Sequence, residues 1–160
     1  MRSLLALALA LAPAALAACG GAEASSPQPT STPAAAEGDA EAVAACETFM
    51  ARARDCTDDY IPALVDLRIE LDLPTGIADF ARTEGRDAVI ARAMEEWATD
   101  SQPAALAATC QKVTTSLTAE QREGQRAGAT ACLAQTACDA YASCAIELMR
   151  PHMTAAKAGQ

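Results

Sequence analysis

Residues 131–144, ACLAQTACDAYASC, decide the fold, because they hold three cysteines within an alanine-rich, helix-forming stretch. Thr136 with Asp139 marks a helix start. The pattern predicts a helix over 137–149 that ends before Pro151, since proline removes a backbone donor and disfavours the helical conformation of the residue before it. Cysteines at positions 132, 138 and 144 point to a helical fold held together by disulfides.

Outward from this stretch, the chain reads as helical from Asp39 onward. Ala, Leu, Glu and Arg dominate, β-branched runs are absent and no segment carries a strand signal. Caps and apolar spacing predict further helices over about 39–55, from about 58 to a stop at Pro74, and over 76–83, 86–98, 103–114 and 119–132. We therefore expect an all-α fold, a small helical bundle that disulfides staple.

The helix that follows Thr118 carries Gly124, Gly128 and Cys132 at four-residue spacing. Each glycine costs about 1 kcal/mol in a helix interior relative to alanine. Their alignment predicts a smooth face for close packing of another helix, with a frayed or broken helix as the alternative.

Residues 1–18 have the features of a secretory signal: a positive start at Met1-Arg2, a Leu- and Ala-rich run, and small residues before a cleavage site. Leu16-Ala17-Ala18-Cys19 resembles the lipobox of bacterial lipoproteins. The resemblance implies that the signal is cut before Cys19, that Cys19 carries a diacylglycerol thioether and an acylated amino group, and that the protein attaches to the membrane through this lipid. Gly20, where an Asp would retain the protein in the inner membrane, implies the outer membrane of a Gram-negative-type cell envelope.

Two other interpretations of the N-terminus stay open: an ordinary signal peptide with a chance cysteine, and a membrane-spanning anchor. The apolar run is shorter than the ~20 residues that a bilayer requires, and Pro13 interrupts it. Residues 19–38 then follow, with three prolines among Gly, Ala, Ser and Thr and no apolar periodicity. This composition predicts a flexible tether, so we expect the folded helical domain to cover 39–160.

The chain has seven cysteines. Without Cys19 an even set remains, and in an exported chain it predicts three disulfides in one of fifteen pairings. A zinc site is disfavoured, because no Cys-x-x-Cys pair is present. The six cysteines are Cys46, Cys56, Cys110, Cys132, Cys138 and Cys144.

Two helices clamped at both ends by disulfides resemble the coiled-coil-helix architecture, whose twin motifs leave nine residues between cysteines. Cys46 and Cys56 match that spacing, whereas only five residues separate Cys138 and Cys144. The resemblance implies Cys46–Cys144 and Cys56–Cys138, which leaves Cys110–Cys132 as the third pair.

The charge balance excludes one class of partner. The formal net charge is −9, and it becomes −10 once residues 1–18, which contain only Arg2 as a charge, are removed. A chain this acidic lacks the basic contacts that nucleic acid requires. Attachment to an anionic membrane surface must therefore come from the lipid on Cys19.

No catalytic motif stands out, and we expect that the protein is not an enzyme and has no cofactor. His152 is the only histidine, it follows Pro151, and no Gly-x-Ser-x-Gly elbow occurs. Asp55, Asp58 and Asp59 lack calcium-loop spacing and read as helix-end carboxylates. Met149, His152 and Met153 could offer soft copper ligands, but we expect no metal dependence.

Two classes of function remain after these exclusions. The first is a non-catalytic, lipid-anchored structural or partner-binding module of the cell envelope. The second is a carrier of a small apolar ligand. A void of about 300 Å³ or more lined by Leu, Ile and Val would favour the carrier, and a solid core with an exposed apolar patch would favour the partner-binding module.

Overall fold

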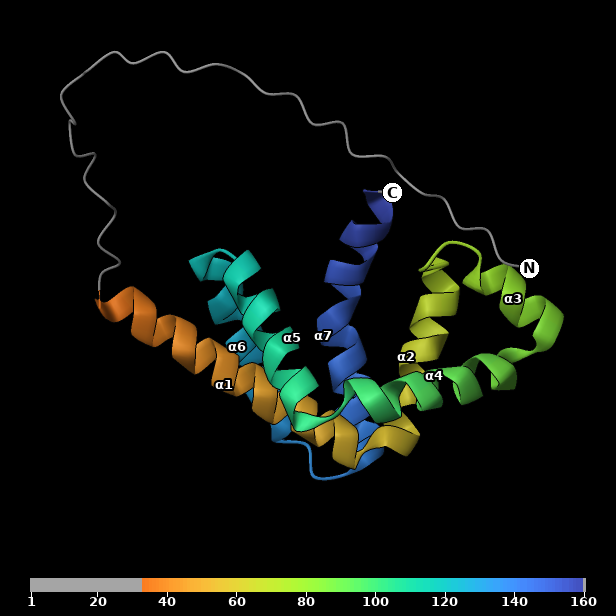
Figure 1. Ribbon diagram of the computed structural model, residues 1–160, viewed down its shortest axis with the longest axis horizontal. Coiled ribbons are helices and arrows are strands. Elements are labelled where there is room, and N and C mark those ends of the chain that lie inside the picture. Colours follow the sequence, from red (N-terminus) through yellow and green to blue (C-terminus); the bar gives the residue numbers. More distant parts are fainter. Residues whose placement is uncertain (1–32, 160) are drawn as a thin grey trace, which may run out of the picture. The chain divides into compact units, whose positions relative to one another are not determined.

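The structure, a computed structural model, describes residues 33–159 and the side chains of residues 39–159. The proposed signal peptide, Cys19 and the tether as far as residue 32 lie outside the described residues. The described part is all-α, without strands, and this confirms the expected fold class (Figure 1). Its helices are α1 (Pro33–Asp55), α2 (Thr57–Leu71), α3 (Ile77–Glu84), α4 (Arg86–Asp100), α5 (Pro103–Ser116), α6 (Ala119–Leu133) and α7 (Cys138–Ala158).

Helix α1 begins at Pro33, earlier than the predicted start at residue 39. Residues 33–38, which the sequence assigned to the tether, therefore belong to this helix. Pro33 suits a first helical turn, where its missing N–H has no intrahelical partner to lose, and the three alanines that follow have the highest helix propensity.

Helix α7 does not end before Pro151 but continues through it to Ala158, so the predicted end at Met149 is wrong. Contacts with α2 and the residue that follows it hold both sides of the proline. Arg150 Nη1 donates to Glu70 Oε1 at 2.6 Å, and Lys157 Nζ donates to the Asp72 carbonyl oxygen at 3.0 Å. These contacts hold α7 against α2 on both sides of Pro151, where the helix lacks one backbone hydrogen bond.

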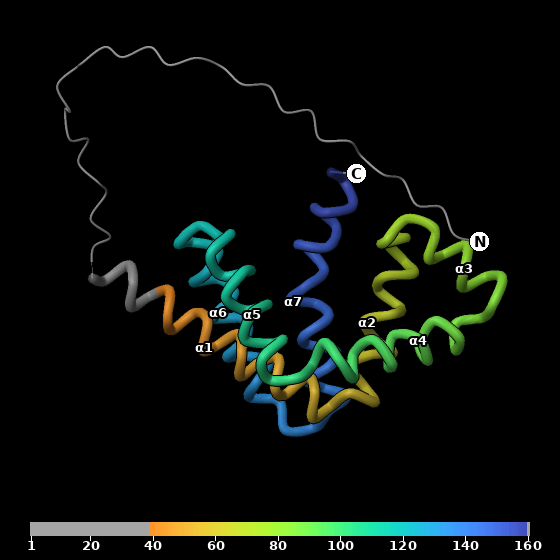
Figure 2. The backbone as a smooth tube through the Cα atoms, viewed as in Figure 1, coloured from red at the N-terminus to blue at the C-terminus, as the bar shows by residue number. Residues whose placement is uncertain are grey.

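The helices pack in two groups that α7 joins. Helix α1 contacts α5 and α6, while α2 contacts α3 and α4. Helix α7 contacts both α2 and α6, and Figure 2 shows its blue tube between the two groups. Helices α1 and α7 also meet directly: the Tyr141 hydroxyl donates to the Phe49 carbonyl at 2.6 Å, and the two rings are 5.4 Å apart. Tyr60 and Tyr141 are the largest fully buried side chains, so aromatic rings lie at the centre of an otherwise aliphatic core.

All six cysteines form disulfides, but only one predicted pair is correct. Cys56–Cys138 is confirmed, and it joins the α1–α2 junction to the start of α7. The pairs Cys46–Cys144 and Cys110–Cys132 are wrong. The actual pairs are Cys46–Cys110 and Cys132–Cys144.

The error in the pairing arises from the packing of α1. The helical turn that carries Cys46 lies against α5, so Cys46 bonds to Cys110 of that helix. The α6 cysteine, Cys132, then bonds to Cys144 of α7. The coiled-coil-helix arrangement would instead require α1 and α7 to lie in register along both cysteine pairs.

No helix in the described part of the chain is long and apolar enough to cross a membrane.

Candidate ligand-binding cleft

Two apolar grooves meet along α7. The first, here called the α6 groove, has a volume of about 330 Å³ and is walled by α1, α5, α6 and α7. The second, the α2 groove, has a volume of about 740 Å³ and is walled mainly by α2, α4, α5 and α7. They share the side chains of Met50, Thr109, Met149 and Met153. The two grooves therefore adjoin at these four side chains, and they are together called the cleft.

Methionines line the junction of the two grooves. Met149 and Met153 are one helical turn apart on α7, and Met50 faces them from α1. The α7 pair shares a face only because the helix continues past Pro151. Methionine is unbranched and polarizable, and it adapts to apolar groups of irregular shape. The junction can therefore fit itself to an apolar ligand.

Aromatic side chains form one wall of the α2 groove. The indole Nε1 of Trp97 donates to Thr57 Oγ1 at 3.0 Å, and its ring lies 5.6 Å from that of Tyr60. The Tyr60 hydroxyl donates to Met149 Sδ at 3.6 Å. Burial raises the pKa of Tyr60 to about 12, against a smaller opposing effect of the Arg68 charge. Tyr60 thus stays neutral, and it presents its ring to an apolar site without a charge.

The charged side chains that line the two grooves differ. Arg68, Glu96 and Asp100 line the α2 groove, so both signs are present. Among the residues whose side chains the structure describes, the α6 groove is lined by Arg122 and Arg126, with His152 as its other ionisable side chain and no carboxylate.

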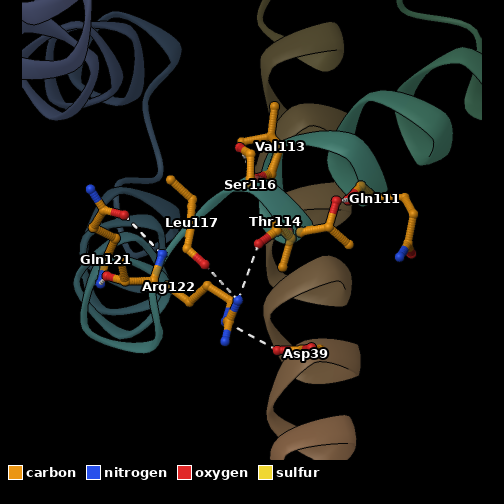
Figure 3. Close-up of polar contacts among 10 residues, drawn as sticks. Asp39, Gln111, Val113, Thr114, Ser116, Leu117, Gln121 and Arg122 are labelled. Atoms are coloured by element: carbon orange, nitrogen blue, oxygen red, sulfur yellow. Dashed lines mark hydrogen bonds and ion pairs between the residues drawn. The ribbon is translucent and has the colours of Figure 1, made fainter. Parts of the chain in front are cut away.

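Arg122 holds the α5–α6 corner together. Its Nη1 donates to the carbonyl oxygens of Leu117 at 2.7 Å and Thr114 at 3.4 Å, and its Nε lies 3.1 Å from Asp39 Oδ1 on α1 (Figure 3). The corner is built locally by a capping box in which Gln121 N donates to Thr118 Oγ1 and Thr118 N donates to Gln121 Oε1. Arg122 is thereby fixed in one place as a structural cation.

Arg126, one turn further along α6, is held less firmly. Its Nε and Nη2 donate to Glu123 at 3.0 and 2.8 Å, and the side chains are 45% and 63% exposed. This hydrogen-bonded ion pair raises the pKa of the Arg126 guanidinium. Exposed pairs of this kind contribute little to stability, so Arg126 can exchange its partner for a ligand.

Asp72 fixes the far end of α7. Its backbone is left-handed, with φ 48°, and its Oδ1 accepts from Gly76 N at 2.8 Å and Ala78 N at 3.1 Å. The Ala78 N–H lowers the pKa of Asp72 most, assisted by Gly76 and by Lys157, whose Nζ is 3.6 Å from Oδ2. One carboxylate therefore joins the start of α3 to the end of α7.

The glycine face of α6 is confirmed at one position only. A Cβ added at Gly128 would meet Leu148 Cδ1 on α7 at 2.3 Å, so the two helices approach closely there. A Cβ at Gly124 would meet nothing within 4 Å. Leu148 lines the α6 groove, so the close approach at Gly128 also shapes the cleft.

The structure brings together Met149, His152 and Met153, as the sequence suggested for soft metal ligands, and adds Met50. No group of three or more His, Cys, Asp or Glu in the described part could hold a metal ion. Sequence reasoning did not identify Met50, Trp97 or Arg126 as parts of a site. The only available signal was the pair Met149 and Met153 at helical spacing, which the expected helix end concealed.

Comparison with known proteins gives no match: no family model, no curated protein and no solved structure resembles the chain significantly.

Proposed function

We propose that the protein is a lipid-anchored, non-catalytic binding protein of the cell envelope that carries a small apolar ligand in the cleft along α7. One observation carries the proposal: two neighbouring grooves of about 330 and 740 Å³ share three methionine side chains in their walls. Ligand sites commonly enclose about 300–1,000 Å³ with mostly apolar walls. The carrier is thus better supported than the purely structural or partner-binding module that the sequence placed first.

The disulfides support this proposal because they tie the walls of the α6 groove. Cys46–Cys110 joins α1 to α5, and Cys132–Cys144 joins α6 to α7. Walls that are fixed before the ligand arrives lose less conformational freedom on binding. A groove stapled in this way stays formed without a ligand.

A partner-binding module is the second candidate, and a different surface favours it. Phe80 on α3 is 40% exposed, beside a groove of about 440 Å³ that Ile77 and Val89 also line. An apolar side chain of a protein partner would fit this groove. In that case Phe80→Ala would abolish binding of the partner and leave the cleft along α7 unaffected.

The chain's only tryptophan, Trp97, lines the cleft and reports on its occupancy. We expect the apolar dye N-phenyl-1-naphthylamine to quench Trp97 fluorescence by energy transfer, saturating at one dye per protein. Met153→Gln, which places an amide at the junction of the grooves, should weaken dye binding by about tenfold, because an unpaired buried polar group is costly.

Met94→Gln is the matched control, since Met94 packs partly buried on the core but does not line either groove. It should leave dye binding unchanged, with circular dichroism as the check on folding. Dye binding that does not saturate, or that Met153→Gln leaves unaltered, would refute the proposal.

The lipid anchor has its own test, because it depends on the sequence around Cys19 and not on the cleft. Cys19→Ser should move the protein from the membrane fraction to the soluble fraction, or leave it unprocessed, while dye binding persists. Signal-cleaved Cys19→Ser protein that stays with the membranes would contradict the lipidation.

A further inference from the structure

We infer that the ligand of the α6 groove is an anionic amphiphile with a single acyl chain, whose head group binds Arg126. This inference rests on the proposed carrier function and names the chemical class of its ligand. It follows from the charge that surrounds the groove, the availability of Arg126 and the apolar surface beyond it.

The charges that line the α6 groove oppose those of the whole chain. The formal net charge is −9, yet the groove is lined by Arg122 and Arg126 with His152 and by no carboxylate from residues 39–159. Three carboxylates that act on these arginines lie close by but outside the lining: Asp39 on Arg122, and Glu123 and Glu41 on Arg126. Asp39 lies 3.1 Å from Arg122 and Glu123 lies 2.8 Å from Arg126, so both carboxylates are within the screening length of about 8 Å. The groove therefore favours an anion that takes the place of Glu123 at Arg126 over a cation, which would meet two arginines.

Arg126 is the cation that can bind the head group. It uses Nε and Nη2 for Glu123, so Nη1 has no hydrogen bond to a residue that the structure describes. Arg122 differs, because two backbone carbonyl oxygens and Asp39 already hold its guanidinium. A planar guanidinium binds a carboxylate or phosphate in fork geometry. Arg126 can therefore bind an anionic head while Arg122 adds a fixed positive charge.

Apolar side chains continue the groove away from the arginines. Phe49 and Leu148 line it, and so does Val113, which is 37% exposed. The shared methionines line the α2 groove as well. An acyl chain that covers these side chains removes apolar area of both chain and protein from water. An amphiphile thus matches both ends of the groove, whereas a wholly apolar molecule matches only one.

The experiment compares three probes of equal chain length below their micelle concentrations: dodecanoate, dodecanol and dodecyltrimethylammonium. Isothermal titration calorimetry on the folded protein should give dodecanoate the highest affinity and the cationic probe the lowest. Arg126→Gln should weaken dodecanoate by about tenfold and leave dodecanol unchanged, since a charge-assisted hydrogen bond is lost. Glu123→Gln should strengthen dodecanoate binding, because it releases Arg126.

Arg82→Gln is the control for removal of one positive charge. Arg82 forms an ion pair with Asp79, three residues before it on α3, as Arg126 does with Glu123 on α6. Arg82 does not line the α6 groove, the α2 groove or the groove beside Phe80. It should leave all three affinities unchanged. Equal affinities for the three probes, or the same loss in Arg82→Gln as in Arg126→Gln, would refute the anionic head group while leaving the carrier intact. Failure of all three probes to bind would refute the carrier itself.

Discussion

Removal of single disulfides tests both the pairing and the contribution of each link to stability. Cys132–Cys144 closes a separation of 12 residues and Cys46–Cys110 one of 64. In the loop-closure model the unfolded chain is restricted by about 3 kcal/mol for the shorter loop and about 4 kcal/mol for the longer one. We therefore expect Cys46→Ala/Cys110→Ala to lose about 1.5 kcal/mol more stability than Cys132→Ala/Cys144→Ala.

The assay is urea unfolding followed by circular dichroism, with the wild type and both double variants at one temperature. Losses of either size are large against the 5–15 kcal/mol of an ordinary domain. Equal losses, or a larger loss for the short loop, would show that native packing around the cysteines outweighs chain entropy.

The single variant Cys132→Ala tests the pairing directly. The structure predicts that it leaves one free thiol, at Cys144. Thiol labelling after denaturation without reductant, then peptide mass spectrometry, locates that thiol. A label at Cys110 would contradict the observed pairing and support the coiled-coil-helix alternative.

Three shorter predictions concern titration and packing. The pKa of Tyr60 is raised to about 12, so the stability that it contributes is complete below pH 10 and is lost as pH rises through 12. Burial also raises the pKa of Tyr141, the other tyrosine of the chain. Absorbance at 295 nm should therefore show neither tyrosine ionising in the native protein at pH 10.5. The pKa of Asp72 is lowered by backbone N–H groups at the start of α3. The stability that Asp72 contributes is therefore present above the unfolded pKa of 3.8 and is lost as pH falls below it. Asp72→Asn should make the free energy of unfolding, measured in urea, depend less on pH in this acidic range. Gly124→Ala should stabilise the protein by about 1 kcal/mol. Gly128→Ala should gain less stability and should weaken dye binding, because its Cβ forces Leu148 to move within the groove. Equal shifts in melting temperature and unchanged dye binding would contradict this.

The sequence predicted well whatever depends on neighbouring residues. Helix type follows from composition and apolar spacing, and the Thr118–Gln121 capping box appears as expected because both of its hydrogen bonds are local. The even number of cysteines predicted three disulfides for the same reason: the count needs no knowledge of packing.

The predictions failed wherever a distant contact decides the outcome. Pro151 stops a helix by local rules, but Glu70 and Asp72 lie about 80 residues away in sequence from the side chains of α7 that they hold. The partner of Cys46 depends on which helix covers α1, and no local pattern specifies this. The sequence did not predict the cleft, because its walls include the part of α7 beyond Pro151 and the helices that pack on α1. Neither of these could be predicted from local patterns.

The disulfides stabilise a helical fold whose core is small and whose surface holds an open groove. The chain has only five aromatic side chains, and a core built mostly of Ala, Leu and Val buries little apolar area per residue. An open groove reduces that area further, because its methionines stay partly exposed. Disulfides act on the unfolded chain and do not need a filled interior. Three disulfides can therefore keep the helices assembled around an open groove, although burial of apolar side chains alone would favour closing it. A carrier must stay folded in this way before its ligand binds.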